Sequence, residues 1–389
     1  MKKKSLVSFA AVLFISSIPF YDVPQFPVPG ITWSFLFGSI FLFLYFIILR
    51  RTERRLTISI YPFLAFAVFL IIYMTSYIYN FTNLDGRGFN HIIFYMITFF
   101  FYYFCFYLAL NFLGKACIQK IIYFGLAVIA LVGTVEILMF FIYGFSEYEN
   151  FLNHGGNVGV YGGLFPRMRS LFNEPSHLAL FVVSCSVFIW DIGLRARLLV
   201  VYILFWTFST SAAFGIAAAV LVYNLYKSCI NRRAIYKINL LLLIIIPASL
   251  FGLLTKFPLF SKLFNMLSGS GSSDSVRLTA LLESIKYVGN SPLIGLGPTF
   301  YYNYSETGLF NLYMQLYIEA GLLGVLFFLL FYFYHIKAAL IKPVYFIAFF
   351  SLFFQYIGMD HYYIPGIWMM LAYMHYDSWL YKKTNRTDT

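Results

Sequence analysis

Residues 120–144 read KIIYFGLAVIALVGTVEILMFFIYG, and this stretch decides the fold. After Lys120, its only charged residue is Glu136, and nearly all the others are aliphatic, aromatic or small. A helix needs about 20 mostly apolar residues to cross the hydrocarbon core of a membrane. The stretch therefore predicts a membrane-spanning helix that carries one buried carboxyl group.

The composition of the whole chain agrees with that reading. Of 389 residues, 61% are hydrophobic and 11% are charged, whereas soluble domains contain about 25% charged residues. Such a chain cannot cover a water-facing surface, so soluble, disordered and disulfide-scaffold classes are excluded. We predict an all-α polytopic membrane helix bundle that forms a single integral membrane domain over residues 1–389.

Other apolar runs long enough to span a membrane follow along the chain, separated by short polar segments. Twelve spans are predicted, near 5–20, 31–49, 57–79, 90–113, 120–144, 176–191, 196–208, 211–228, 237–255, 311–334, 343–358 and 364–381.

The basic residues test this count of spans. With both termini in the cytoplasm, 20 of the 27 Lys and Arg residues fall on the inner side, as the positive-inside rule requires. The net charge of +12 is then mostly topology and indicates no nucleic-acid partner. The three lysines at the N-terminus also suit a signal peptide, but no cleavage site follows, so we expect an uncleaved anchor.

Two predicted outer loops are too long to be simple connections, namely residues 145–175 and 256–310. Long loops are usually functional or disordered. In the second loop, Leu278, Leu281, Leu282 and Ile285 recur at helical spacing. This pattern predicts an amphipathic helix over 275–288 that lies on the outer membrane surface.

Arg167 and Arg169 are on the outer side, against the bias of the other basic residues. They precede the start of the sixth span, where free backbone N–H groups and the helix dipole favour an anion. Two arginines there make a competent phosphate or diphosphate site. The alternative is that they contact lipid headgroups or pair with Glu147, Glu149 or Glu174.

Two more outer arginines are weaker candidates. Arg277 lies on the amphipathic helix and has either a ligand or a lipid headgroup as its partner. Arg87 lies in the short turn Asp85-Gly86-Arg87-Gly88 and either binds substrate or pairs with Asp85.

Inside the spans, polar residues gather on one face of the tenth. Asn311, Gln315 and Glu319 are spaced four apart, and Glu136 lies at a depth similar to that of Glu319. A carboxylate in lipid is costly, so these groups must face the bundle or a wet cavity. They either contact substrate or form a hydrogen-bonded stripe that joins helices.

His177, one turn into the sixth span, is either a substrate contact or a buried structural donor. No nucleotide-binding loop is present on the inner side. The four cysteines form no CxxC pair, which gives no support for a disulfide or a zinc site. Four other histidines have no partner at metal-ligand spacing: His91, His154, His361 and His375.

Three segments together resemble a family of bacterial membrane enzymes. Residues 167–177, RMRSLFNEPSH, look like a segment that precedes a span in polysaccharide polymerases, and residues 209–215, STSAAFG, like the serine-rich span start of the same superfamily. The third segment combines Arg277 and residues 291–298, SPLIGLGP, with residues 311–324, NLYMQLYIEAGLLG, and is similar to the signature of O-antigen polymerases and O-antigen ligases.

The resemblance implies a GT-C-like membrane glycosyltransferase that acts on undecaprenyl-diphosphate-linked oligosaccharide at the outer face of the bacterial inner membrane. It implies no cofactor, metal or nucleotide, because the lipid diphosphate is the leaving group. It makes Arg167, Arg169 and Arg277 the expected diphosphate ligands and Glu174 an acid/base or acceptor-orienting group. His177, Asn311, Gln315, Glu319, Glu136 and Arg87 are the expected substrate-binding residues.

One position departs from the ligase pattern. Ligases carry a histidine directly before the asparagine of the last motif, and here that residue is Phe310. Polymerisation of repeat units for O-antigen, capsule or exopolysaccharide is therefore favoured over transfer of polymer to lipid A core. The expected partners are membrane lipid and the chain-length regulator and flippase of the same pathway.

Two other functions compete with these. A flippase for the same lipid-linked oligosaccharide should carry cationic groups in the middle of its spans, whereas the few Lys and Arg residues in these spans stand at the span ends. A structural membrane subunit would leave the two long outer loops unexplained.

Overall fold

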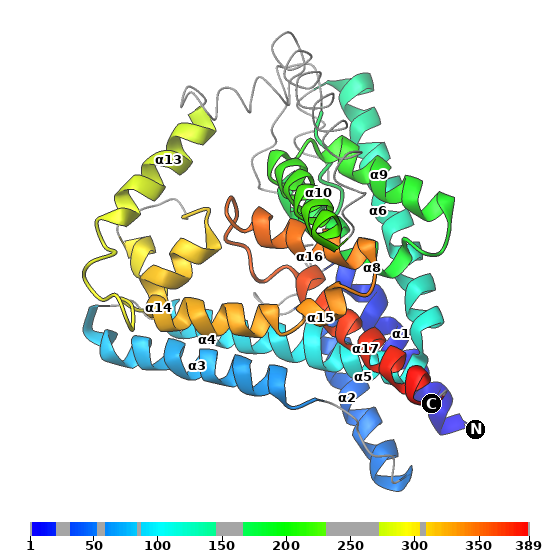
Figure 1. Ribbon diagram of the computed structural model, residues 1–389. Helices are drawn as coiled ribbons and strands as arrows, with labels where there is room; N and C mark the ends of the chain where they lie inside the picture. The colour runs from blue at the N-terminus through cyan, green and yellow to red at the C-terminus, as the bar shows by residue number, and fades with distance from the viewer. Residues whose placement is uncertain are drawn as a thin grey trace.

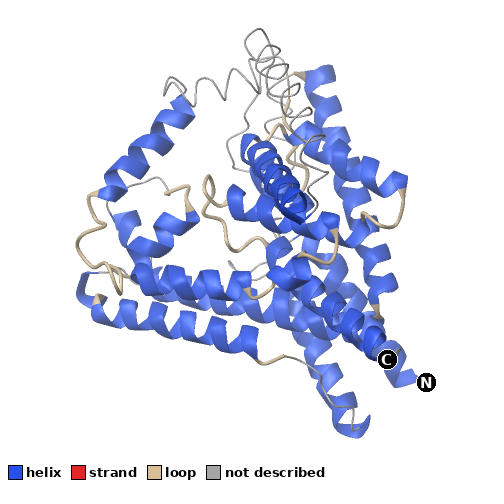
Figure 2. Ribbon diagram, viewed as in Figure 1, coloured by secondary structure: helices blue, strands red, loops and turns tan. Residues whose placement is uncertain are grey.

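The computed structural model describes residues 2–20, 32–52, 59–83, 87–144, 166–230, 272–303 and 309–387. These residues form helices joined by turns and contain no strand (Figure 2). The prediction of an all-helical membrane protein is confirmed. By length and composition, five helices are able to cross a membrane: Tyr61–Tyr79, Arg87–Leu113, Lys115–Tyr143, Thr210–Cys229 and Leu312–Ala339.

Four shorter apolar helices accompany them: Ser5–Phe20, Trp33–Ile48, Pro175–Ile189 and Pro343–Gln355. The predicted span near 237–255 lies outside the described residues, so the count of twelve stays a prediction.

The first half of the chain builds one side of the bundle. Its helices are α1 (Lys2–Ser17), α2 (Trp33–Thr52), α3 (Tyr61–Tyr79), α4 (Arg87–Thr98), the π-helix η3 (Phe99–Cys105), α5 (Phe106–Leu113) and α6 (Lys115–Tyr143). Short 3-10 turns are η1 (Ile18–Phe20) and η2 (Phe81–Asn83). α4, η3 and α5 follow one another without a break.

The second half completes the bundle (Figure 1). Its helices are α8 (Pro175–Ile189), α9 (Leu194–Thr207), α10 (Thr210–Ile230), α13 (Ser272–Ile285), α14 (Leu312–Phe333), α15 (Ile336–Ala339), α16 (Pro343–Gln355) and α17 (Pro365–Thr387), with the 3-10 turn η5 at Phe300–Asn303. α3 packs against α14, and α8 packs against α9, α16 and α17. Both ends of the chain appear at the lower right of Figure 1.

Local sequence explains where several helices begin and end. Pro175, Pro343 and Pro365 each stand at the start of a helix, where the missing N–H costs nothing and the fixed φ suits the first turn. Gly114, with φ of 80°, separates α5 from α6. A residue with a side chain adopts that conformation only at a cost.

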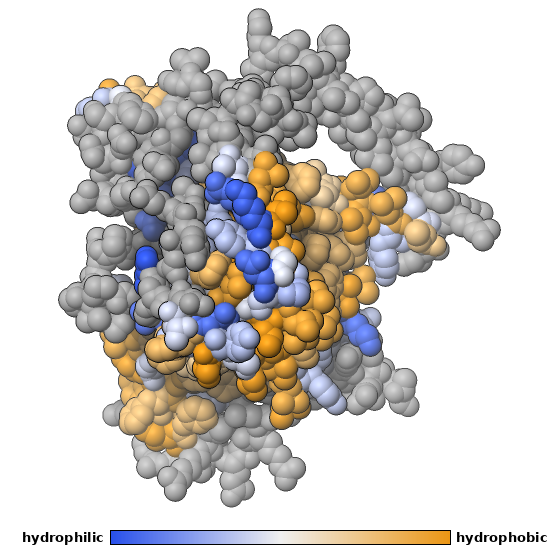
Figure 3. Space-filling model, turned by 90° about the vertical axis from the view of Figure 1, so that its left-hand side faces the viewer, coloured by the Kyte–Doolittle hydropathy of each residue, from blue (hydrophilic) through white to orange (hydrophobic). Residues whose placement is uncertain are grey.

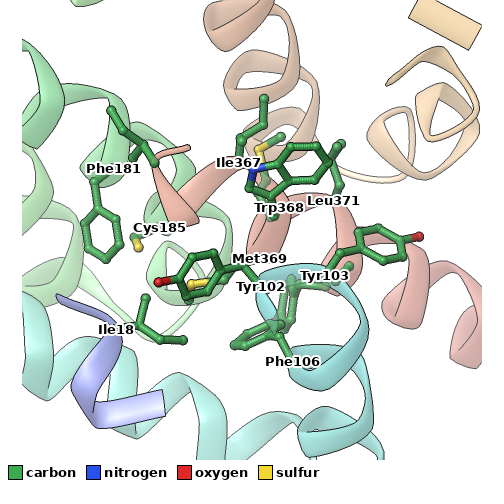
Figure 4. Packing of buried hydrophobic residues seen from close by; sticks show 14 of the residues in the cluster. Ile18, Tyr102, Tyr103, Phe106, Phe181, Cys185, Ile367, Trp368, Met369 and Leu371 are labelled. Atoms are coloured by element: carbon green, nitrogen blue, oxygen red, sulfur yellow. The ribbon is translucent and has the colours of Figure 1, made fainter. Parts of the chain in front are cut away.

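The core lies where α8 and α17 meet the π-helix. Trp368 and Met369 of α17 belong to one buried cluster with Tyr102 and Phe106 from the first half and with Phe181 of α8, and Figure 4 shows Met369 beside Tyr102. α8 is buried on nearly all sides, as expected for a helix that is apolar all round.

The outward faces of the bundle are apolar. Phe43, Ile71 and Phe124 are more than 60% exposed, and hydrophobic residues cover much of the described surface in Figure 3. Patches of this extent on a water-facing monomer are unusual. They suit a surface that contacts lipid.

Candidate functional site

The segment that follows residue 165 enters the bundle as a buried loop anchored by an ion pair. Arg169 donates from Nε to Oε1 of Glu136 at 2.9 Å, and both residues are 0% exposed. The backbone N–H groups of Arg169 and Ser170 both donate to the other carboxylate oxygen at 2.8 Å. One carboxylate of α6 therefore holds both the charge and the backbone of the loop.

Glu136 is not among the partners that the sequence predicts for Arg169. Arg169 was expected to bind diphosphate or to pair with a nearby outer glutamate, and its carboxylate partner comes instead from within the fifth predicted span. The pairing joins residues 33 positions apart, which no local spacing reveals.

Met168 and Arg167 fix the same loop against α9 and α6. The N–H of Met168 donates to the carbonyl of Trp206 at 2.8 Å, and its side chain packs against the bare backbone of Gly133. Arg167, which is half-buried, donates from Nε to the carbonyl of Thr207 at 3.1 Å. A cation at the last carbonyls of a helix is favourable.

At the end of this loop, a carboxylate and two imidazoles come together. Glu174 precedes α8, and its Oε2 lies 3.9 Å from Nε2 of His177. The ring of His361, from the turn before α17, meets the ring of His177 edge-on with centroids 4.1 Å apart. One ligand atom from each of the three residues lies within 4.8 Å of the other two.

Polar neighbours surround this cluster. Oδ1 of Asp360 lies 3.0 Å from Nδ1 of His361, and the hydroxyl of Tyr363 lies 3.2 Å from the same nitrogen. The hydroxyl of Ser176 donates to Glu174 at 2.9 Å. In the sequence, His361 has no partner at metal-ligand spacing. In the folded chain, Asp360, Tyr363 and His177 lie beside it.

A polar pocket opens beside the cluster. It has a volume of about 360 Å³, within the range of small-molecule sites. It is lined by Arg87, Asn90, His91, Phe94, Thr299, Tyr302, Tyr362 and Tyr363.

Three chain segments meet in this pocket, which lies on the side predicted to face outward. Arg87 is exposed at the first turn of α4, and Tyr363 reaches from the pocket wall to the His361 ring, at 5.3 Å between centroids. Arg87, a weak candidate in the sequence, is thus the arginine that the structure places in the pocket.

The surroundings of Tyr302 change the pKa of its phenol. Burial, followed by the nearby charges of Asp360 and Glu319, raises the pKa of its phenol. The phenol therefore stays protonated at physiological pH and can donate a hydrogen bond.

Glu319 lies beneath the pocket and is 0% exposed. It accepts from the hydroxyl of Tyr73, from the backbone N–H of Thr299 at 2.9 Å and from Nε2 of Gln315 at 3.2 Å. His91 Nδ1 lies 3.7 Å away. Apart from His91, whose charge depends on protonation, the partners of this carboxylate are neutral donors.

Two glycines allow the outer loop to cross α14 at this level. At Gly321, φ is 67° and ψ is −169°, which breaks the helix. A Cβ at Gly321 would lie 2.3 Å from the carbonyl of Leu293, and one at Gly295 would lie 2.5 Å from the N of Ala320. Neither position tolerates a side chain.

The crossing is held by four backbone hydrogen bonds. Leu296 and Gly297 donate to the carbonyls of Ile318 and Glu319, and Leu322 and Leu323 donate to the carbonyls of Pro292 and Leu293. Residues 291–298 and 311–324, which form the last of the three family-like segments, therefore make one structural unit that fixes the floor of the pocket.

Asn311 and Gln315, predicted to share a face with Glu319, have contacts inside the protein. Oδ1 of Asn311 accepts from the N–H of Met314 at 3.0 Å and caps α14. Gln315 is 3% exposed and donates to Glu319. These contacts favour the hydrogen-bonded stripe over direct substrate contact.

The structure describes only part of the predicted outer loops. The side chain of Arg277 and residues 145–165 and 231–271 lie outside the described residues. α13 occupies Ser272–Ile285, in the region where an amphipathic helix is predicted.

Sequence reasoning missed Asn90, Asp360, Tyr302, Tyr362 and Tyr363. For Asp360, Tyr362 and Tyr363 a signal was present, since residues 360–363 are polar or aromatic and stand shortly before a proline that begins a helix, just as polar residues 173–174 stand before the proline of α8.

Residues 196–329 match the family described as O-Antigen ligase. The match is consistent with the O-antigen polymerase and ligase superfamily and supports a role in the processing of O-antigen or a related polysaccharide. A comparison with curated proteins gives no match.

Proposed function

We propose that this protein is a polysaccharide polymerase of the bacterial inner membrane. It joins undecaprenyl-diphosphate-linked repeat units at the outer face, in the synthesis of O-antigen, capsule or another exopolysaccharide. The family match over residues 196–329 supports the polysaccharide substrate.

The observation that carries the proposal is the pocket that contains Arg87. A guanidinium group binds phosphate oxygens with paired, directed N–H donors, and Arg87 opens a helix whose N-terminus also favours an anion. Asn90 and the phenol of Tyr302 offer hydrogen bonds for sugar hydroxyls. A pocket with one cation, amide and phenol donors and aromatic walls suits a sugar attached to a diphosphate.

The reaction that fits this pocket is a displacement at the anomeric carbon. A hydroxyl oxygen of one lipid-linked repeat forms a bond to the anomeric carbon of the growing chain. The bond from that carbon to the diphosphate oxygen breaks with inversion. The lipid diphosphate leaves with the electron pair, and the hydroxyl proton passes to solvent or to the diphosphate.

The outer cations stabilise the charge that develops on the leaving diphosphate. We assign this role to Arg87 and Arg167, with Arg277 as a further candidate from the resemblance. Arg169 acts through Glu136 by positioning the loop that carries Arg167.

The remaining predicted residues serve the acceptor and the floor of the pocket. We assign Glu174 to orienting the acceptor hydroxyl and His177 to supporting it. Glu319, Gln315 and Asn311 hold the pocket floor. A chain-length regulator and a flippase of the same pathway would act beside the site.

An in vitro assay tests the proposal. Purified protein with lipid-linked repeat should produce a ladder of longer glycans. Arg87→Ala should reduce the ladder by about 10²–10³-fold, the cost of removing one donor to a developing charge, and Arg87→Lys should retain part of it. Lys286→Ala, at an exposed position on the turn after α13, should behave as wild type.

Two outcomes contradict the assignment. An unchanged ladder from Arg87→Ala removes the pocket from the reaction, and no ladder from folded wild type removes polymerisation itself.

A ligase is the second candidate, because the matched family is described as O-Antigen ligase. Offering lipid A core and lipid-linked repeat as competing acceptors separates the two functions. Phe310, at the position where ligases carry histidine, predicts that the lipid-linked repeat is preferred.

A further inference from the structure

The cluster of Glu174, His177 and His361 has the composition of a metal site. It offers two imidazole nitrogens and one carboxylate oxygen, drawn from the start of α8 and from the turn before α17. Two histidines and one glutamate are a ligand set that zinc takes in enzymes. Mg²⁺ and Ca²⁺ prefer sites made of oxygen ligands, so the imidazoles favour a transition metal.

The distances suit closure around an ion. Zinc bonds of about 2.0–2.2 Å place tetrahedral ligands about 3.4 Å apart. Here one ligand atom from each residue lies within 4.8 Å of the others, and Nε2 of His177 is 3.9 Å from Oε2 of Glu174. Small rotations of the Glu174 and His361 side chains, which are 41% and 23% exposed, close the remaining gap.

The neighbours of the cluster form the outer layer that metal sites require. Ligating histidines usually have a carboxylate or carbonyl at their other ring nitrogen, which fixes the tautomer and the orientation of the ring. Nδ1 of His361 has the hydroxyl of Tyr363 as its hydrogen-bond partner at 3.2 Å, and the carboxylate of Asp360, 5% exposed, lies 3.0 Å from the same nitrogen. The hydroxyl of Ser176 donates to Glu174. His361 and Glu174 therefore each have a polar neighbour that orients the side chain.

We propose that Glu174, His177 and His361 bind one divalent transition-metal ion, with zinc as the best-suited metal. Three protein ligands leave at least one coordination position for an oxygen, from water or from a phosphate group. Tyr363 connects the site to the polar pocket, because its ring lies 5.3 Å from that of His361 and it also lines the pocket. The site goes beyond the proposed function, which requires no metal.

The other reading is a purely structural contact. The edge-on packing of the two imidazoles and their nearness to Glu174 would then hold α8 against the turn before α17 without an ion. This reading predicts that the protein binds zinc no better than its variants do.

Metal content separates the two readings. The full chain is purified through a tag without histidine, stripped with chelator and dialysed against buffered zinc, and zinc per chain is measured by mass spectrometry. Wild type should retain one ion. His361→Ala and Glu174→Gln should each lose it, whereas His375→Ala, which removes a histidine bound to Tyr103, should retain it.

Folding of each variant is followed by size-exclusion chromatography in detergent. Absence of zinc in folded wild type overturns the proposal, and so does equal zinc in wild type and both ligand variants. If His361→Ala does not fold, the more exposed Glu174 decides the question through Glu174→Gln.

A second variant tests the outer layer. Asp360→Asn should weaken zinc affinity by about 10–100-fold, the usual effect of removing such a partner. An unchanged affinity would contradict the role of Asp360.

A separate measurement tests whether one coordination position of the metal is open. Cobalt in place of zinc reports its coordination by visible absorption. Added inorganic diphosphate should change that spectrum in wild type, and an unchanged spectrum would contradict a position open to phosphate. None of these measurements depends on glycan synthesis, so failure of the metal site and failure of the proposed function are distinguishable.

Discussion

Two glutamates, Glu136 in α6 and Glu319 in α14, are both 0% exposed inside membrane helices, yet their partners differ. Glu136 faces the guanidinium of Arg169, while Glu319 faces a phenol, an amide and a backbone N–H. Both carboxylates also accept backbone N–H groups from an outer loop. In this bundle, a buried carboxylate is the means by which a loop is fastened to a helix.

The two sites differ in what a substitution leaves behind. Removing the arginine from the first site leaves a buried charge without its partner, whereas Glu319→Gln at the second site removes the charge itself and disturbs hydrogen bonds from neutral donors. The first site should therefore be the more sensitive of the two.

Arg169→Ala should have the largest effect. Breaking a buried ion pair by removing one partner costs about 3–5 kcal/mol, which here should appear as a loss of unfolding free energy measured by denaturant titration in mixed micelles. The double variant Glu136→Gln with Arg169→Gln should recover part of the loss, because no charge is left buried. Arg197→Ala, at an exposed position on α9, is the control. A loss below about 1 kcal/mol, typical of surface pairs, would show that Glu136 does not depend on Arg169.

Gly321→Ala should follow. The combination of positive φ and extended ψ is almost exclusive to glycine and costs a residue with a side chain about 1–3 kcal/mol, and overpacking adds about 1–3 kcal/mol. The same titration measures the loss. Gly289→Ala, where nothing lies within 4 Å of the added Cβ, should leave stability nearly unchanged. Equal stability of the two variants would mean that the crossing at Gly321 does not form.

Glu319→Gln should cost less, about 1–3 kcal/mol, the range for a buried group left without its partner. The amide keeps one acceptor for the N–H of Thr299 but presents donors where the carboxylate had accepted. Glu283→Gln on α13, which is exposed, serves as the matched change. A loss at Glu319 larger than that of Arg169→Ala would reverse the comparison.

Asn311→Ala should be the mildest change. Loss of a helix cap costs about 1 kcal/mol, seen as a small shift in the thermal unfolding midpoint. Asn311→Asp keeps an oxygen in place and should restore the midpoint. Failure of the aspartate to do so would assign another role to Asn311.

Composition and elementary energetics were enough to predict the fold class. The cost of charge in lipid also placed Glu136 and Glu319 away from lipid, and both are fully buried. The starts of α8 and α16 follow from Pro175 and Pro343, because proline suits the first turn of a helix.

Pairings across the chain could not be predicted in this way. His177 and His361 meet only because α8 packs against α17, and periodicity describes one helix at a time. The spacing of Gly295 and Gly321 is visible in the sequence, but the crossing of two backbones is a property of the folded chain.

That crossing also constrains the order of assembly in the membrane. α14 is broken at Gly321, and the N–H groups of Leu322 and Leu323 obtain their acceptors from Pro292 and Leu293 of the loop. Unpaired backbone groups are not tolerated in lipid, so a newly inserted α14 is incomplete until this loop docks. We therefore expect loop docking to follow membrane insertion of α14, and the pocket above Glu319 to form only with docking.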